Sequence, residues 1–191
     1  MNIFALDYDP AKCAEYHCDR HVCKMIVETT QLLSTAHRVL DNYWEQKMNG
    51  KTLYHLSDPT LDSILYKATH VNHPCSVWAR DRKTNYSWLY QLGEQLCFQY
   101  TIRYGKIHKC QNLIVNTLSQ NPKNFPNTPS LHSGFVQCMP EEYKNSLSAV
   151  LAYKNYYNRE KNKFAKWKYT KTPMWYEPMP SLLKGQKNAS V

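Results

Sequence analysis

The stretch from Asp19 to Leu40 constrains the fold most, because an apolar row and a polar row run along it at one helical spacing. The apolar side chains recur every three or four residues, which predicts an amphipathic helix with one buried side. They are Val22, Met25, Ile26, Leu32, Leu33, Ala36 and Val39. The polar row consists of His21, Lys24, Glu28, Gln31, Thr35 and Arg38. We interpret this mixed row either as the wall of a binding or catalytic site or as a solvated face.

The length and composition indicate one folded domain. A chain of 191 residues can bury one substantial core, and its 42% hydrophobic and 20% charged residues are typical of globular proteins. There is no apolar run of about 18 residues, so we expect no membrane span. The start of the chain lacks the pattern of a secretory signal, which favours a cytoplasmic location. We expect a single domain over residues 1–180 and a flexible tail over residues 181–191.

The charge of the chain favours an anionic partner. The formal net charge is +9, which suits a nucleic acid, a nucleotide or another polyphosphate. The 15 tyrosines and 5 tryptophans offer flat surfaces on which bases could stack, although the same rings can equally fill the core. The sequence leaves the oligomeric state open.

Seven cysteines are scattered along the chain, and no two of them form a Cys-x-x-Cys pair. A zinc site built from Cys13, His17, Cys18 or His21 is conceivable, but the spacing does not place these side chains on one helix face. Reduced thiols that fill the core are the favoured interpretation. We therefore expect no metal and no cofactor.

Local signals divide the first half of the chain into short helices and a polar loop. Asp9-Pro10 predicts a helix start, with Asp9 as the cap, and that helix should run through His17. Residues 42–58 are polar, with a turn signal at Asn49-Gly50, and predict a loop with a brief helix at residues 43–47. Residues 61–66 have the spacing of another short helix.

The segment around Asn72-His73-Pro74 predicts a second helix start. Pro74 suits the first helical position, and Asn72 or His73 would be the cap. Free backbone N–H groups at such a start can bind an anion, and His70 and Arg80 would add donors. The alternative is that Asn72 and His73 only cap the helix.

A long amphipathic helix is predicted from Thr84 to Tyr104, ended by Gly105. Arg103, Lys106, His108 and Lys109 cluster at its carboxyl end. These cations could complement the helix dipole or bind phosphate groups.

The last third alternates helices with irregular chain. We expect a helix over residues 111–118, a loop over 121–130, extended chain over 132–139 and a helix from Pro140 to about Glu160. Residues 161–176 interleave lysines with aromatic residues, including Trp175, which suits a nucleic-acid strand or a tail packed on the body. The fold class predicted from the whole pattern is all-α, a single compact domain of four to five helices with a basic aromatic carboxyl-terminal tail.

Several of these pieces resemble the pyrimidine-dimer DNA glycosylase family, the endonuclease V type of phages. Asp19-Arg20-His21 followed by Glu28 two helical turns later resembles that family's His-to-Glu arrangement on an amphipathic helix. His70-Val71 and the long helix after it resemble the central helix of the family. Thr172-Pro173-Met174-Trp175-Tyr176 resembles its aromatic carboxyl end. The segments His-Val-x-Lys-Met and Asn-His-Pro-Cys-x-x-Trp-Ala also resemble a group of phage proteins.

The resemblance implies a compact helical fold and a DNA glycosylase and lyase activity. In the family, the amino-terminal α-amine attacks sugar C1′ to form a Schiff base, and the helix Glu stabilises charge and assists elimination. Carried over, the Glu role falls on Glu28 and the phosphate-contacting role on His21. Two departures stand out: Val27 replaces an Arg before the Glu, and Met1-Asn2 replaces a start from which Met is readily trimmed. The amine would also lie several residues further from the helix.

Three hypotheses follow for the function. The first is a glycosylase-like enzyme with Glu28 and His21 as catalytic residues. The second is a binding protein that sequesters a nucleotide-derived defence signal without turning it over. The third is a structural protein whose polar row is a buried network. The candidate ligand- or phosphate-binding residues are Lys24, Gln31, Arg38, Asn72, His73, Trp78, Arg80, Arg103, Lys106, His108 and Trp175.

Overall fold

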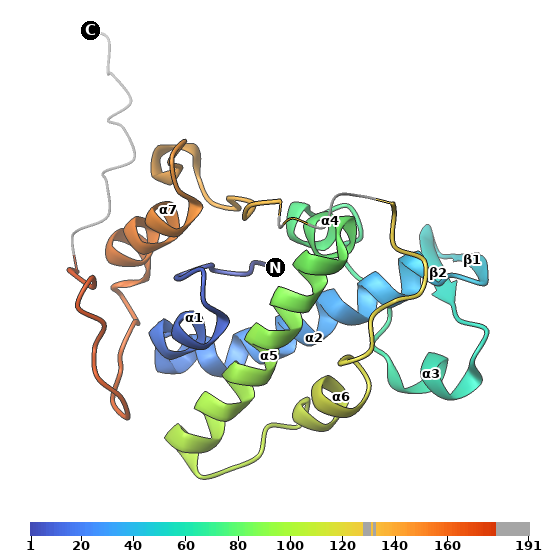
Figure 1. The fold of residues 1–191 in the computed structure, drawn as a ribbon, viewed down its shortest axis with the longest axis horizontal. Helices are drawn as coiled ribbons and strands as arrows, with labels where there is room; N and C mark the ends of the chain where they lie inside the picture. Colours follow the sequence, from blue (N-terminus) through green and yellow to red (C-terminus); the bar gives the residue numbers. More distant parts are fainter. Residues whose placement is uncertain (128–130, 132, 179–191) are drawn as a thin grey trace, which may run out of the picture.

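The computed structural model shows a mostly α-helical protein (Figure 1). It describes residues 1–127, 131 and 133–178, so the tail expected over residues 181–191 lies outside the described residues. Within the described ranges there are seven α-helices and one two-stranded sheet. A mostly helical fold is therefore confirmed, but the strand pair corrects the all-α prediction, and the helices outnumber the four to five expected.

Two 22-residue helices form the centre of the fold. Helix α2 spans Asp19–Leu40, with the predicted bounds, and α5 spans Lys83–Tyr104 and ends at Gly105, whose φ of 61° is left-handed. The two helices cross in Figure 1, and the crossing is close. A Cβ atom added at Gly93 of α5 would lie 2.8 Å from Cγ2 of Thr29 in α2. Glycine at position 93 thus allows the helices to approach this closely.

The amino-terminal arm and helix α1 pack into the same core. Helix α1 spans Pro10–Tyr16, and the Asp9 side chain accepts hydrogen bonds from the first backbone N–H groups, as predicted. Residues 3–6 are almost fully buried, at 0–5% exposure. The arm is therefore part of the hydrophobic core, and its packing determines where residues 1 and 2 lie.

The polar region after α2 forms a β-hairpin, which corrects the predicted loop and brief helix. Strand β1 spans Trp44–Met48 and pairs antiparallel with β2, Lys51–His55. Asn49 and Gly50 join them with φ angles of 51° and 71°, and two positive φ values in a two-residue loop favour a tight hairpin. Turn chemistry and cross-strand pairing therefore outweighed the weak helical signal of residues 43–47. Helix α3 follows over Pro59–Ile64.

Two helices flank α5 along the chain. Helix α4 spans Pro74–Asp81, and the Nδ1 atom of its cap residue His73 accepts a hydrogen bond from Cys75 N at 3.2 Å. Helix α6 spans Gln111–Asn116, slightly shorter than predicted. The helix start inferred from the Asn-His-Pro segment is confirmed, and His73 is the cap.

The helix predicted from Pro140 to Glu160 is wrong in its first half. Only a 3-10 turn forms at Glu141–Tyr143, and helix α7 begins later and spans Ala149–Tyr156. A π-helical turn over Tyr157–Lys161 continues α7. Ser148 caps α7 by accepting a hydrogen bond from Leu151 N, and this cap inside the predicted range starts the helix later than expected.

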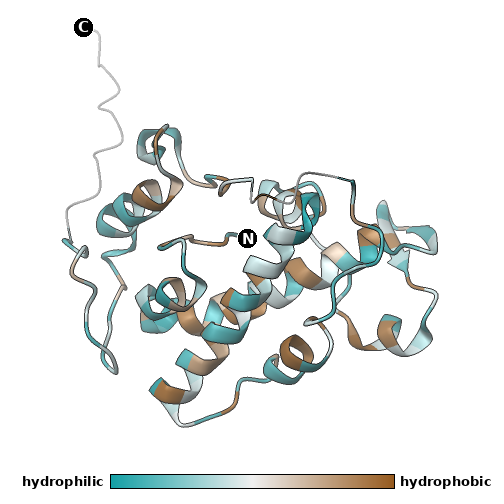
Figure 2. Cartoon of the chain, in the orientation of Figure 1, coloured by the Kyte–Doolittle hydropathy of each residue, from teal (hydrophilic) through white to brown (hydrophobic). Residues whose placement is uncertain are grey.

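The polarity of the elements matches their positions. Figure 2 shows a largely hydrophilic hairpin, while hydrophobic positions recur along α2 and α5, which bury much of the core. No helix among the described residues combines the length and the apolar character needed to cross a membrane.

Candidate functional site

The start of the chain meets the polar row of α2 at Glu28. The backbone N–H of Asn2 donates a hydrogen bond to Glu28 Oε2 at 2.8 Å, and Lys24 Nζ lies 3.3 Å from Oε1. The Glu28 side chain is 12% exposed, whereas that of Lys24 is 61% exposed. A nearly buried carboxylate therefore lies beside the first residues of the chain, and the mostly exposed Lys24 pairs with it from the solvent side.

The side chain of Asn2 fixes this arrangement. Its Nδ2 donates to the carbonyl oxygen of Cys138 at 2.7 Å, and its Oδ1 accepts from the hydroxyl of Tyr153 at 2.8 Å. Oδ1 also accepts from the backbone N–H of Ile3 at 2.8 Å. Asn2 thereby ties together the amino-terminal arm, α7 and the extended chain before α7. The additional residues before α1 fold back, so their length does not carry the amino terminus away from Glu28.

Three side chains of metal-binding types, His73, Cys75 and Cys138, converge near the start of the chain. Cys75 Sγ and Cys138 Sγ are 3.4 Å apart, and Ser76 Oγ lies 3.9 Å from Met1 Sδ. The hydrogen bond from Cys75 is the main cause that lowers the pKa of Cys138 to about 7, and the positive amino terminus adds to it. Burial lowers the pKa of His73, and the positive charge of the amino terminus lowers it further. The negative charge of Glu28 raises this pKa and offsets part of the shift.

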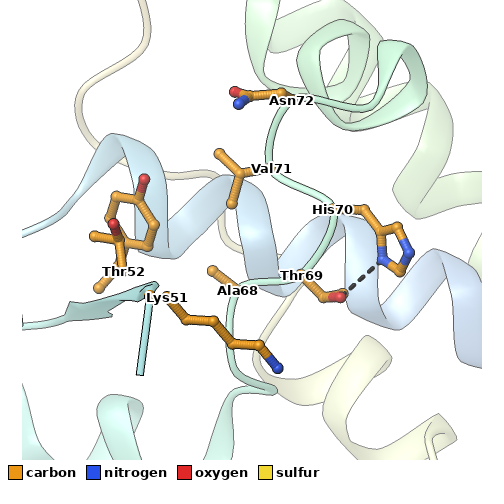
Figure 3. Close-up of a pocket in the computed structure, with 9 residues that line it drawn as sticks. Lys51, Thr52, Ala68, Thr69, His70, Val71 and Asn72 are labelled. Carbon is orange, nitrogen blue, oxygen red and sulfur yellow. Dashed lines mark hydrogen bonds between the residues drawn. The ribbon is translucent and has the colours of Figure 1, made fainter. Parts of the chain in front are cut away.

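Two pockets border this region and share Asn72. The larger, about 560 Å³, lies between the hairpin and the chain before α4, and Lys51, His70 and Asn72 are among its lining residues (Figure 3). His70 has a φ of 50°, and its Nδ1 is hydrogen-bonded to the Thr69 hydroxyl at 2.8 Å. The second, about 410 Å³, is lined by Trp78 and Phe135. Glu28 lines neither pocket, so the carboxylate and the hollows are neighbouring features rather than one cavity.

The predicted phosphate-binding role of Arg38 is corrected by its surroundings. Arg38 is fully buried, and its five N–H groups donate to the carbonyl oxygens of Tyr54, Tyr66, Leu65 and Asp62 and to the carboxylate of Asp62. A guanidinium has five N–H donors, so none is left for a ligand. Burial alone would raise the pKa of Asp62, but hydrogen bonds, first from Arg38, lower it to about 2. Arg38 thus holds the hairpin and α3 onto α2.

The predicted phosphate-binding role of Arg103 is also corrected, because its guanidinium is buried and hydrogen-bonded within the protein. It is 3% exposed and donates to the carbonyl oxygens of Glu15 and His17, to the Asp19 carboxylate and to Gln99. These bonds connect the carboxyl end of α5 to the junction between α1 and α2. The guanidinium is a structural link and does not face the solvent, so the predicted cluster with Lys106 does not form.

His21 is also buried rather than placed at a surface that could meet phosphate. It is 3% exposed, its Nδ1 is hydrogen-bonded to the Tyr157 hydroxyl, and its ring lies 4.6 Å from that of Phe4. Burial lowers the pKa of His21 to about 2, so the ring is neutral. His21 and Glu28 lie seven residues apart on α2, as predicted. The His21 ring, however, is buried against Phe4 and Tyr157, whereas the Glu28 carboxylate contacts Asn2 and Lys24.

The other predicted residues are distributed over several places. Asn72 and Trp78 line pockets near the amino terminus, and Arg80 Nη1 donates to the Val71 carbonyl oxygen at 2.7 Å. Gln31 is half-buried on α2. Lys106 and His108 line a separate pocket of about 460 Å³.

The aromatic carboxyl end packs on the body. Trp175 lines a pocket of about 340 Å³ beside Tyr16, and its ring lies 6.0 Å from that of Tyr157. Trp167 is 8% exposed. Of the two interpretations of the tail, the described rings favour packing, while several lysines of the segment remain exposed.

The sequence alone missed the residues that complete the site. Asn2, Cys75 and Cys138 were not selected, because they are far apart in the chain and follow no shared period. All seven cysteines are free thiols, and five are buried, which confirms the expectation of reduced core thiols for most of them. The conceivable zinc group in α1 and α2 is not formed; in the described part of the chain, the ligand atoms that converge belong to His73, Cys75 and Cys138.

Comparison with known proteins places the chain beside a known family. Residues 1–112 match the profile of a family described as pyrimidine dimer DNA glycosylase. This region is more than half of the chain. The chain belongs to this family. The match contains the amino-terminal arm, Glu28, the α4 start and all of α5, so the matched region includes the whole crossing of α2 and α5. No curated protein and no solved structure gives a significant match.

Proposed function

We propose that this protein is a DNA glycosylase and abasic-site lyase that uses the α-amine at the start of the chain as its nucleophile and Glu28 as its carboxylate. The observation that carries the proposal is the 2.8 Å hydrogen bond from Asn2 N to Glu28 Oε2. In the printed sequence the amine belongs to Met1, one residue before this nitrogen. Removal of Met1 would place a primary amine at the Asn2 nitrogen itself.

The chemistry needs an unprotonated amine near a carboxylate. The amine nitrogen attacks C1′ of a deoxyribose and loses a proton, while the base leaves with the electrons of the glycosidic bond and a proton. Opening of the sugar ring then gives an imine that links the amine and C1′. Glu28 stabilises the positive charge that develops on the sugar and removes a proton from C2′, after which the 3′-phosphate leaves. The net charge of +9 favours the approach of a DNA backbone.

The proposed roles can be tested by trapping the imine. Protein is mixed with duplex DNA that carries an abasic site or a pyrimidine dimer, and borohydride is added to reduce any imine to a stable amine. We expect a covalent protein–DNA complex, and mass spectrometry of its amino-terminal peptide identifies whether Met1 or Asn2 is joined to the sugar. Absence of a complex when the amine is free would refute the proposal.

The role of Glu28 needs its own variant. We expect Glu28→Gln to slow strand cleavage at an abasic site by about 100-fold or more, the size of a typical acid–base contribution. Glu45→Gln, on the exposed hairpin strand β1, is the matched control and should cleave normally. Sequestration, the second hypothesis, would instead give an unaltered small nucleotide released on heating the purified protein and no strand cleavage.

A further inference from the structure

The three side chains around the amino terminus have the composition of a zinc site. The ligand atoms of His73, Cys75 and Cys138 all lie within 4.8 Å of one another. Thiolate and imidazole are ligands that zinc prefers, and two Cys with one His is a known zinc-binding set. We propose that His73, Cys75 and Cys138 bind one Zn²⁺ ion. This inference does not depend on the glycosylase activity.

The spacing of the two sulfur atoms suits a tetrahedral ion, and the imidazole, which lies within 4.8 Å of them, would move inward by up to about 1 Å. Zinc–sulfur bonds of about 2.3 Å at tetrahedral angles separate two sulfur atoms by about 3.8 Å. The two sulfur atoms are 3.4 Å apart, so each thiol needs to shift outward by only about 0.2 Å. Binding replaces the S–H···S hydrogen bond, and both thiols lose their protons to solvent.

The backbone around the ligands is already held in place. His73 and Cys75 lie at the cap and the second position of α4, and His73 Nδ1, which accepts from Cys75 N without the ion, would exchange that hydrogen bond for the bond to zinc. On the other side, Cys138 N donates to the Tyr153 hydroxyl at 3.2 Å, and Cys138 O accepts from Asn2 Nδ2. Such outer contacts orient ligands and strengthen metal binding. The ligand from each segment is therefore positioned before the ion arrives.

Three protein ligands leave one tetrahedral position for a water molecule or another donor. The zinc ion would hold the chain around Cys138 against the start of α4. Zinc would add a cross-link between two segments that are more than 60 residues apart in the sequence.

The test measures metal content and ligand identity in the full chain. Protein purified under reducing conditions with added zinc is assayed by elemental mass spectrometry, and we expect about one ion per chain. Co²⁺ in place of zinc should give the sulfur-to-metal charge-transfer absorption of thiolate ligands. Less than about 0.1 zinc per chain, or a cobalt spectrum without thiolate bands, would overturn the proposal.

Variants identify the ligands. Cys75→Ser, Cys138→Ser and His73→Gln should each weaken zinc binding by more than about 100-fold, beyond the usual cost of losing an outer contact. Cys23→Ser is the matched control, because Cys23 is a half-buried thiol on α2 outside the group. Zinc should raise the melting temperature of the wild type and of the control only. Wild-type affinity in either cysteine variant of the group, or a Cys75–Cys138 disulfide that forms while the reduced protein binds no zinc, would contradict the site.

Discussion

The backbone nitrogen of Asn2 and the carboxylate of Glu28 are hydrogen-bonded across 26 residues of sequence, at 2.8 Å. This contact places the first residue of the chain beside the acidic group on the central helix. It exists because the arm over residues 3–6 is buried and because the Asn2 side chain is bound on two sides. The geometry of the proposed site therefore depends on the packing of residues 3–6 and on the side-chain contacts of Asn2.

The contributions of Asn2 and Tyr153 to the free energy of unfolding should be coupled, because their side chains are hydrogen-bonded. We expect Asn2→Leu to lower the free energy of unfolding by about 1–3 kcal/mol, because it removes one of the partners of the Tyr153 hydroxyl and the donor to the Cys138 carbonyl oxygen. Tyr153→Phe should overlap with it, giving a coupling energy of about 0.5–3 kcal/mol in a double-mutant cycle measured by urea unfolding. Strict additivity would show that the contact contributes nothing. Leucine is chosen because it is large, so trimming of Met1 is not promoted.

Arg38 should matter for stability and not for ligand affinity. Arg38→Met leaves the Asp62 carboxylate without its cation and frees several buried carbonyl oxygens, so we expect a loss of about 3–5 kcal/mol. Lys24→Met is the comparison, since the Lys24 side chain is mostly exposed and its removal should cost below about 1 kcal/mol. Chemical denaturation measures both. If folded Arg38→Met instead bound DNA much more weakly at unchanged stability, the structural role would be refuted.

His17 should make the protein less stable in mild acid. Burial lowers the pKa of His17 from 6.5 to about 4, so the folded state keeps the neutral ring. As the pH falls from 6.5 to 4, only the unfolded state takes up the proton, and the free energy of unfolding should fall by roughly 3 kcal/mol. The stability that depends on neutral His17 is thus fully present above pH 6.5 and is lost as the pH falls from 6.5 towards 4. The lowered pKa of His21 should likewise reduce the free energy of unfolding as the pH falls.

The pH dependence can be assigned with one variant. His17→Asn can keep the hydrogen bond to the Cys13 carbonyl oxygen but cannot titrate, so its stability should change less between pH 7 and pH 4.5. Asp62, with a pKa of about 2, loses its contribution only at pH values below about 4. An unchanged slope in His17→Asn would mean that other groups control this pH range.

The close crossing of α2 and α5 should require glycine at position 93. Gly93→Ala places a methyl group 2.8 Å from Thr29 Cγ2, an overlap whose typical cost of about 1–3 kcal/mol exceeds the helix-propensity gain of about 1 kcal/mol. We expect a lower melting temperature in thermal unfolding. Thr29→Ser removes the opposing methyl group, so the double variant should recover the loss. A Gly93→Ala variant as stable as the wild type would show that the helices separate easily.

Much of the helical framework followed from local sequence. The 22 residues of α2, the Asp9 and His73 caps and the end of α5 at Gly105 were predicted because periodicity, capping and left-handed glycine act over a few residues. The hairpin and the late start of α7 were missed. In both places a weak helical period competed with a turn or cap that determines the structure.

The sequence by itself determined that Glu28 lies on an amphipathic helix and that the chain is basic and mostly helical. Tertiary structure decided which polar side chains share a site. Arg38 and Arg103 look like ligand-binding cations in the sequence, but each is buried with its donors bound to carbonyl and side-chain oxygens of distant segments. Asn2, Cys75 and Cys138 converge only through long-range packing. A period of 3.6 residues reports one helix face, and it carries no information about what the rest of the chain brings to that face.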